Sequence, residues 1–197
     1  MSTPSAQCRA VAKHTLQIFK GDLKVQAYYD DSRMRSIDLI TTLDSVHKGV
    51  KSIGTIGLSE IALVDMDGNE FATRVELCAA AVASEVYWEN VVASAAFYIE
   101  KRKSAVMPGE VIPNVFYDYL SEPLMPHLYL TVPFIWNDAY FPELDCSGIK
   151  INWLQCIAIY EIEKAFIEKF GGDAFEDLLS EQEINTLDSG RRVVDLS

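Results

Sequence analysis

The sequence predicts an α+β fold, a single compact domain over residues 1–197 with a mixed, mainly antiparallel sheet and helices packed on its faces. Three observations predict it. Residues 149–159 are an apolar run that leaves little room for a solvent face, which is typical of a strand buried on both sides. The side chains of residues 37–43 alternate in polarity, as in a strand with one face packed on the core and the other face wetter. Apolar side chains in residues 88–99 recur at helical spacing, as in a helix that lies across a sheet.

The composition is that of an ordinary globular protein of 197 residues, 49% hydrophobic and 23% charged. A chain of this length buries roughly 70% of its unfolded surface in one domain. Its apolar runs are shorter than the ~20 residues that span a bilayer, and its start lacks the features of a signal peptide. We therefore expect a cytoplasmic protein with no membrane partner.

The chain is strongly acidic, with 17 basic and 29 acidic residues and a net charge of −12. This balance disfavours direct binding to nucleic acid, because affinity there comes mainly from lysine and arginine that neutralise phosphates. An acidic surface speeds encounter with a basic partner. Solubility alone is the alternative explanation of the charge.

The first predicted element is a helix that starts with Thr3 as N-cap and Pro4 in the first turn, and ends at Gly21. Its side chains expected to face the core are Cys8, Val11, Ala12, Thr15, Ile18 and Phe19. His14 lies off this stripe, so we expect it to be exposed.

The next segments predict strands. They are residues 25–29, 37–43, 51–59, 61–64 and 71–77. Residues 30–32 form a turn, and the Asp-Gly pair in residues 65–69 predicts a hairpin turn. Gly54 and Gly57 lack the pattern of a phosphate-binding loop, so we expect close backbone approach or a bulge there.

A second helix is predicted to begin at Ser84 and to close with basic residues 101–103. Its stripe expected to face the core is Trp88, Val92, Ala95 and Ile99. Residues 107–142 hold six of the seven prolines, which forbid long helices and interrupt strand pairing. This segment should therefore form loops around one strand, residues 127–132.

The C-terminal segment predicts a strand and two helices. After residues 149–159 the periodicity changes at Tyr160, and a helix follows that ends at the glycine pair 171–172. Its side chains expected to face inward are Ile162, Ala165, Phe166 and Phe170. Asp173 and Glu176 predict the capping pair of a second short helix, with Phe175, Leu178 and Leu179 facing inward.

Four motifs resemble those of the Suppressor of Fused domain and follow one another along the chain as they do in that family. In the longest, Trp-Leu-Gln at 153–155 is followed by a helix, Gly-Gly at 171–172, Leu-Leu at 178–179, Asp188 and Arg-Arg-Val-Val at 191–194. The other three are residues 54–59, 108–114 and 126–136. The sequence departs from the family pattern at the helix entrance, where Ala158 and Tyr160 stand near the place of an expected proline and Ser or Thr cap.

No motif of a catalytic centre is present in the sequence, and we predict no catalytic residue, cofactor or metal site. The four cysteines are widely spaced, so free thiols are expected. His127 lies between a proline and an apolar strand, which favours a structural histidine over a catalytic one. Asp188 with Arg191 or Arg192 is expected to form an ion pair that ties the C-terminal turn to the body.

The resemblance implies a stoichiometric binding protein. Compact bacterial members of the family are associated with polymorphic toxin systems as immunity proteins, so the implied partner is a cognate toxin, basic and often a nuclease. Residues 137–145 are acidic and aromatic, as in an exposed contact loop. The predicted partner-binding residues are the anchors Tyr140 and Phe141 and the charged rim Asp138, Glu143 and Asp145. A loop that folds back onto the core is the alternative.

Two other classes stay open at this point. A regulatory scaffold would sequester a protein by adding its peptide as a strand to a sheet edge. An enzyme of unidentified type would show a deep pocket with perturbed titratable groups.

Overall fold

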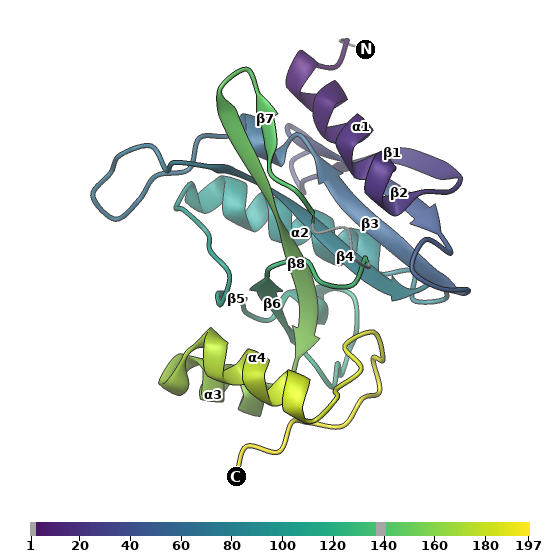
Figure 1. Ribbon diagram of the computed structural model, residues 1–197, viewed down its shortest axis with the longest axis vertical. Helices are drawn as coiled ribbons and strands as arrows, with labels where there is room; N and C mark the ends of the chain where they lie inside the picture. The colour runs from purple at the N-terminus through teal and green to yellow at the C-terminus, as the bar shows by residue number, and fades with distance from the viewer. Residues whose placement is uncertain (1–2, 137–140) are drawn as a thin grey trace.

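A computed structural model describes residues 3–136 and 141–197. Within these ranges the chain forms one sheet and four α-helices, which confirms the α+β prediction (Figure 1). The strands are β1 (Leu23–Tyr29), β2 (Ser36–Leu43), β3 (Val50–Ile56), β4 (Arg74–Val82), β5 (Val111–Ile112), β6 (His127–Thr131), β7 (Leu144–Cys146) and β8 (Ile149–Ile159). The helices are α1 (Ala6–Phe19), α2 (Trp88–Arg102), α3 (Glu161–Phe170) and α4 (Gly172–Glu181), with 3-10 turns at Leu58–Glu60 and Val115–Asp118.

The sheet is mixed and mainly antiparallel, in the order β1-β2-β3-β4-β8-β6-β5, with β7 paired to the first part of β8. β4 and β8 pair in parallel, from Arg74 opposite Ile151 to Cys78 opposite Gln155, and the other paired strands are antiparallel. β8 therefore joins the meander of β1–β4 to the strands that follow α2.

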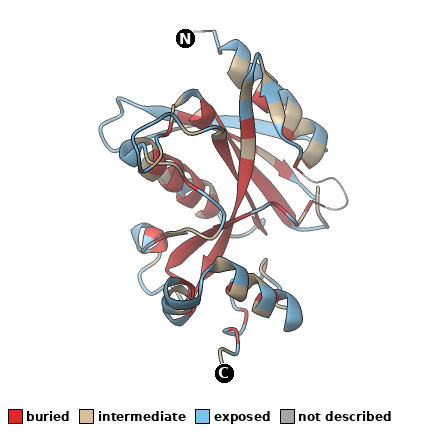
Figure 2. Cartoon of the chain, turned by 60° about the vertical axis from the view of Figure 1, so that its left-hand side comes forward, coloured by how far each residue is buried: buried red, intermediate tan, exposed pale blue. Residues whose placement is uncertain are grey.

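The two faces of β8 pack against different helices, which is why its residues from Trp153 to Ile159 are all buried (Figure 2). Leu154, Cys156 and Ala158 belong to the core beneath α2. On the opposite face, Trp153 packs in the cluster beneath α1. Ile157, on that same face, packs in the cluster beneath α3 and α4. The predicted strand is confirmed, and it is buried on both sides from Trp153 to Ile159.

Three helix starts differ from the prediction. The N-cap of α1 is Ser5, whose Oγ accepts a hydrogen bond of 2.9 Å from the Cys8 N–H. α2 starts at Trp88 instead of Ser84, and no side chain caps it. α4 starts at Gly172, so Asp173 lies in its first turn instead of capping it. A polar capping residue in the sequence indicates a helix start only to within a few residues. The packing of the apolar face of the helix decides where its first turn forms.

The inward face of α3 is also corrected. Ile162 and Phe170 are 59% and 55% exposed, whereas Glu163 and Ile167 face the core. An inward glutamate contradicts a prediction based on apolar periodicity alone. At the helix entrance, the carboxylate of Glu163 accepts a hydrogen bond of 3.0 Å from the N–H of the N-cap residue Tyr160, as the third helical residue does in a capping box.

Residues 61–64 form no strand; within the described chain, Val64 makes only isolated bridges to Glu70 and Ser104. The hairpin turn at Asp65 is present, and Asp65 accepts the Asn69 N–H at 2.9 Å. His14 is half-buried instead of exposed, because its ring stacks on Trp153 with centroids 4.8 Å apart.

Gly172 is required by close packing. A Cβ at this position would lie 2.6 Å from the Tyr129 hydroxyl oxygen and 2.7 Å from the Cα of Gly109. We expect Gly172→Ala to lower the free energy of unfolding by about 1–3 kcal/mol, because a backbone atom must move to admit the methyl group. Urea denaturation measures the change. Gly190→Ala is the matched control, since its nearest contact would be 3.4 Å away; equal losses in both variants would contradict the close-packing account.

Candidate partner-binding site

Phe141 of the predicted contact loop packs in an aromatic cluster with Trp136, the residue before that loop. Phe141 is 9% exposed, and its ring centroid lies 5.3 Å from those of Trp136 and Trp153 and 5.7 Å from that of Phe19. The Trp136 indole N–H donates a hydrogen bond of 2.7 Å to Ser52. The ring of Phe141 is thus packed in the core in this structure, and its role in partner binding stays a prediction.

The other predicted contact residues lie at or before the β7–β8 hairpin. Glu143 is exposed, and its carboxylate lies 3.0 Å from Lys150 Nζ. The hydrogen bond from Lys150, joined by one from Asn152, holds the pKa of Glu143 below its usual range. Asp145 accepts the Gly148 N–H at 2.8 Å in the hairpin turn. Asp138 and Tyr140 lie outside the described residues. The two described carboxylates are therefore both exposed.

A cavity of about 430 Å³ lies between α4 and the sheet. Its floor is formed by Tyr129 and Ile157, which are 0% and 2% exposed. Leu179 of α4 forms one wall. Phe134, which is 57% exposed, lies on the segment that leads to the aromatic cluster and also lines the cavity. No local sequence pattern indicates this cavity, because its lining comes from β6, β8, α4, Phe134 and the segment that follows α4.

Glu176 of α4 is the carboxylate that lines the cavity beside the sheet. Its Oε1 accepts hydrogen bonds from the Tyr129 hydroxyl at 2.7 Å and the Thr131 hydroxyl at 2.6 Å. Burial, together with the Glu176 carboxylate, raises the pKa of Tyr129, so this hydroxyl stays protonated and donates at neutral pH. Glu176 was predicted as half of a helix cap; instead it is held against the sheet.

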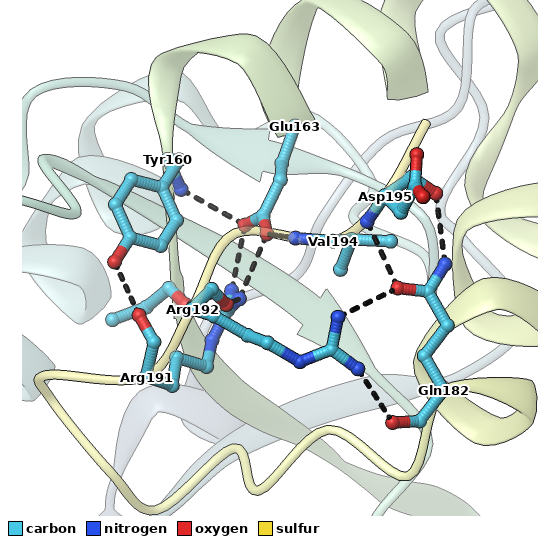
Figure 3. Close-up of polar contacts among 8 residues, drawn as sticks. Tyr160, Glu163, Gln182, Arg191, Arg192, Val194 and Asp195 are labelled. Atoms are coloured by element: carbon cyan, nitrogen blue, oxygen red, sulfur yellow. Dashed lines mark hydrogen bonds and ion pairs between the residues drawn. The ribbon is translucent and has the colours of Figure 1, made fainter. Parts of the chain in front are cut away.

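The C-terminal segment is fastened by a buried ion pair (Figure 3). The Arg191 guanidinium donates to the Glu163 carboxylate at 2.7 and 2.6 Å, and the side chains are 3% and 0% exposed. The Tyr160 and Val194 N–H groups also donate to this carboxylate at 3.0 Å. The predicted clamp is present, but its acid is Glu163. Asp188 instead accepts the Gly190 N–H at 2.8 Å within its own turn.

His127 is a structural residue whose two ring nitrogens both form hydrogen bonds. It is fully buried, and its Nδ1 accepts a hydrogen bond of 2.9 Å from the Asn114 N–H. The proton of the neutral ring is then on Nε2, which lies 2.6 Å from the Glu161 carboxylate and donates to it. That hydrogen bond lowers the pKa of Glu161. Both ring nitrogens are engaged, as expected for a histidine that holds α3 to β6.

Cys8, Cys78, Cys146 and Cys156 are free, and burial raises the pKa of Cys78 and Cys156, which disfavours the reactive thiolate. In residues 3–136 and 141–197, no three His, Cys, Asp or Glu side chains come together as metal ligands would. Among the helices of the same ranges, none is long and apolar enough to cross a membrane.

Comparison with known proteins identifies a matching family and a sequence relative. A family model described as Suppressor of fused protein (SUFU) matches residues 33–192. The "Immunity protein YqcF" of Bacillus subtilis strain 168 is 31% identical over 186 residues, which cover 94% of this chain and 96% of the relative.

Solved structures share the fold. A putative SUFU homolog from Neisseria gonorrhoeae FA 1090 superimposes with a TM-score of 0.72 at 13% identity, over 97% of this chain and 98% of the homolog. A Sufu–Fu complex gives 0.64 at 12% identity, over 91% of this chain and 86% of the matched one. Drosophila Suppressor of Fused gives 0.58 at 12% identity, over 90% of this chain and 47% of its own. With the family model matched over residues 33–192 and 31% identity along nearly the whole chain, this protein belongs to the Suppressor of fused family.

Proposed function

We propose that this protein is an immunity protein that neutralises a cognate toxin by binding it stoichiometrically, with no bond made or broken. The observation that supports this most is the 31% identity to an immunity protein over 94% of the chain. The family match points the same way, because another member of the fold was solved as a complex with a protein, Fu. The proposed activity takes place in the cytoplasm.

The partner proposed here is a basic toxin, a nuclease in particular. Nucleases carry positive surfaces that bind phosphates, and a chain of net charge −12 is complementary to such a surface. Charge complementarity accelerates association, whereas affinity also requires a packed contact with a few anchors.

The proposed contact surface includes the loop that leads into β7. Asp138, Glu143 and Asp145 form its charged rim, and Tyr140 is its anchor. Phe141 acts by holding the loop on the aromatic cluster, because its ring packs against Trp136 and Trp153. A rim of carboxylates around an aromatic side chain is the arrangement that suits a basic protein surface.

The test uses the toxin domain encoded by the neighbouring open reading frame. We expect a 1:1 complex by light scattering, rescue of growth on co-expression, and an association rate that falls about tenfold or more between 50 and 500 mM salt, because screening shortens the range of the charges. The dissociation rate should change much less. Stopped-flow fluorescence gives both rates.

A control variant isolates the loop. Glu143→Gln and Asp145→Asn together should slow association, whereas Asp65→Asn and Asp67→Asn, in the β-turn after residue 64, should not. A toxin domain that stays active and uncomplexed in the presence of excess protein would refute the proposal. Binding of a short extended peptide in place of the folded toxin domain would favour a sequestering scaffold.

A further inference from the structure

The cavity beneath α4 has the size and walls of a binding site. Its volume of about 430 Å³ falls within the roughly 300–1,000 Å³ that ligand pockets span. Tyr129, Ile157 and Leu179 give it a largely apolar lining, and all three are buried. Such walls suit a stem of methylene groups.

The charged side chains that line the cavity are all acidic. Its ionisable lining residues are Glu176, Glu183 and Tyr129, and none of the described residues that line it is lysine, arginine or histidine. The Tyr129 hydroxyl is a neutral donor, so two carboxylates remain. A neutral ligand would leave Glu176 desolvated without a counter-charge, and an anion would be repelled.

Glu176 is already oriented for a cation. Two hydroxyl donors, from Tyr129 and Thr131, both bind Oε1, and among the described residues no donor reaches Oε2. A carboxylate fixed by neighbouring donors loses little freedom when a ligand binds, which favours affinity. A hydrogen bond between two charged groups is also about twice as strong as one between neutral groups.

From this shape and charge we propose that the cavity receives one basic side chain, an arginine or lysine, of the partner protein. Its methylene stem packs on Tyr129, Ile157 and Leu179, and its charged head pairs with Glu176, with Glu183 at the exposed rim. The identity of the partner as the toxin rests on the proposed function, whereas binding of the basic group does not.

The first test uses small probes on the isolated full chain. We expect n-butylguanidinium and n-butylammonium to shift the amide NMR signals of residues around the cavity, and Glu176→Gln to weaken both about tenfold or more. Glutamine keeps an oxygen that accepts from Tyr129 and Thr131, so the packing is retained. Glu181→Gln removes the same charge from an exposed position of α4 outside the cavity and should leave the affinity unchanged.

A second variant guards against misfolding of the first. Ser180 is exposed and lines the cavity, so Ser180→Phe should block it without crowding the core and abolish the shifts. The inference is overturned if Ser180→Phe leaves cation binding intact, if neutral n-pentanol binds the native protein as tightly as the cations do, or if Glu181→Gln weakens the cations as much as Glu176→Gln.

The second test measures binding of the toxin domain. Glu176→Gln should weaken its binding about tenfold, mainly through faster dissociation, and Glu181→Gln should not. If small cations bind but Glu176→Gln leaves toxin affinity unchanged, the cavity does not serve this partner and the inference fails while the proposed function stands. If the toxin domain does not bind the native protein, the proposed function fails, and cation binding is judged by the probes alone.

Discussion

Arg191→Ala is expected to lower the free energy of unfolding by about 3–5 kcal/mol. Glu163 is fully buried, and the guanidinium of Arg191 is its counter-ion. Removing that group leaves a carboxylate in the core with two backbone N–H donors and no opposite charge. Urea denaturation at neutral pH, followed by far-UV circular dichroism, measures the loss.

Arg192 provides the matched control. It is exposed and hydrogen-bonds to Gln182, so Arg192→Ala should cost less than about 1 kcal/mol. The double variant Glu163→Gln with Arg191→Met should recover at least half of the loss, because a neutral pair of similar volume avoids the unpaired charge. Equal effects of Arg191→Ala and Arg192→Ala would show that the ion pair does not anchor the C-terminal segment.

Phe141→Ala is expected to cost about 3–5 kcal/mol, as other truncations of buried aromatic side chains do. The change removes a ring that contacts Phe19, Trp136 and Trp153. These three residues come from α1, from the segment after β6 and from β8. The cavity left behind is lined by rigid aromatic side chains, which cannot collapse into it. Thermal and urea unfolding measure the change.

Phe134→Ala separates this core role from a surface role. Phe134 is 57% exposed, so its truncation should cost less than about 1 kcal/mol. If Phe141→Ala leaves stability unchanged and abolishes toxin binding, the Phe141 ring is a surface anchor and the packing account is wrong. If it lowers stability while the folded protein still binds the toxin, the ring serves the fold.

Periodicity predicted the elements whose residues share one environment. β8 is buried from Trp153 to Ile159 because both faces are covered there, and the stripe of α2 from Trp88 to Ile99 is buried as predicted. Periodicity failed on α3, where the core position is taken by Glu163. Hydropathy ranks glutamate as a surface residue, and only its long-range partner Arg191 makes the burial favourable.

The candidate site was harder to predict from the sequence than the fold was. Composition drew attention to the loop before β7, but it did not reveal that Phe141 packs inward on three other rings. The family resemblance, which includes Asp188 and an Arg, favoured Asp188 as the acid of the clamp over the more distant Glu163. The cavity beneath α4 brings together Tyr129, Ile157 and Glu176, and no local pattern encodes such a meeting of three elements.

The parallel pairing of β4 with β8 has a consequence for synthesis at the ribosome. The N-terminal meander can form early, but the open edge of β4 stays unpaired until the strand that starts at Ile149 has been translated. A prematurely ended chain therefore presents a row of free amide and carbonyl groups that invites aggregation. A chain that ends before β8 should therefore aggregate more readily than one that includes residues 149–159, which cover this edge of β4.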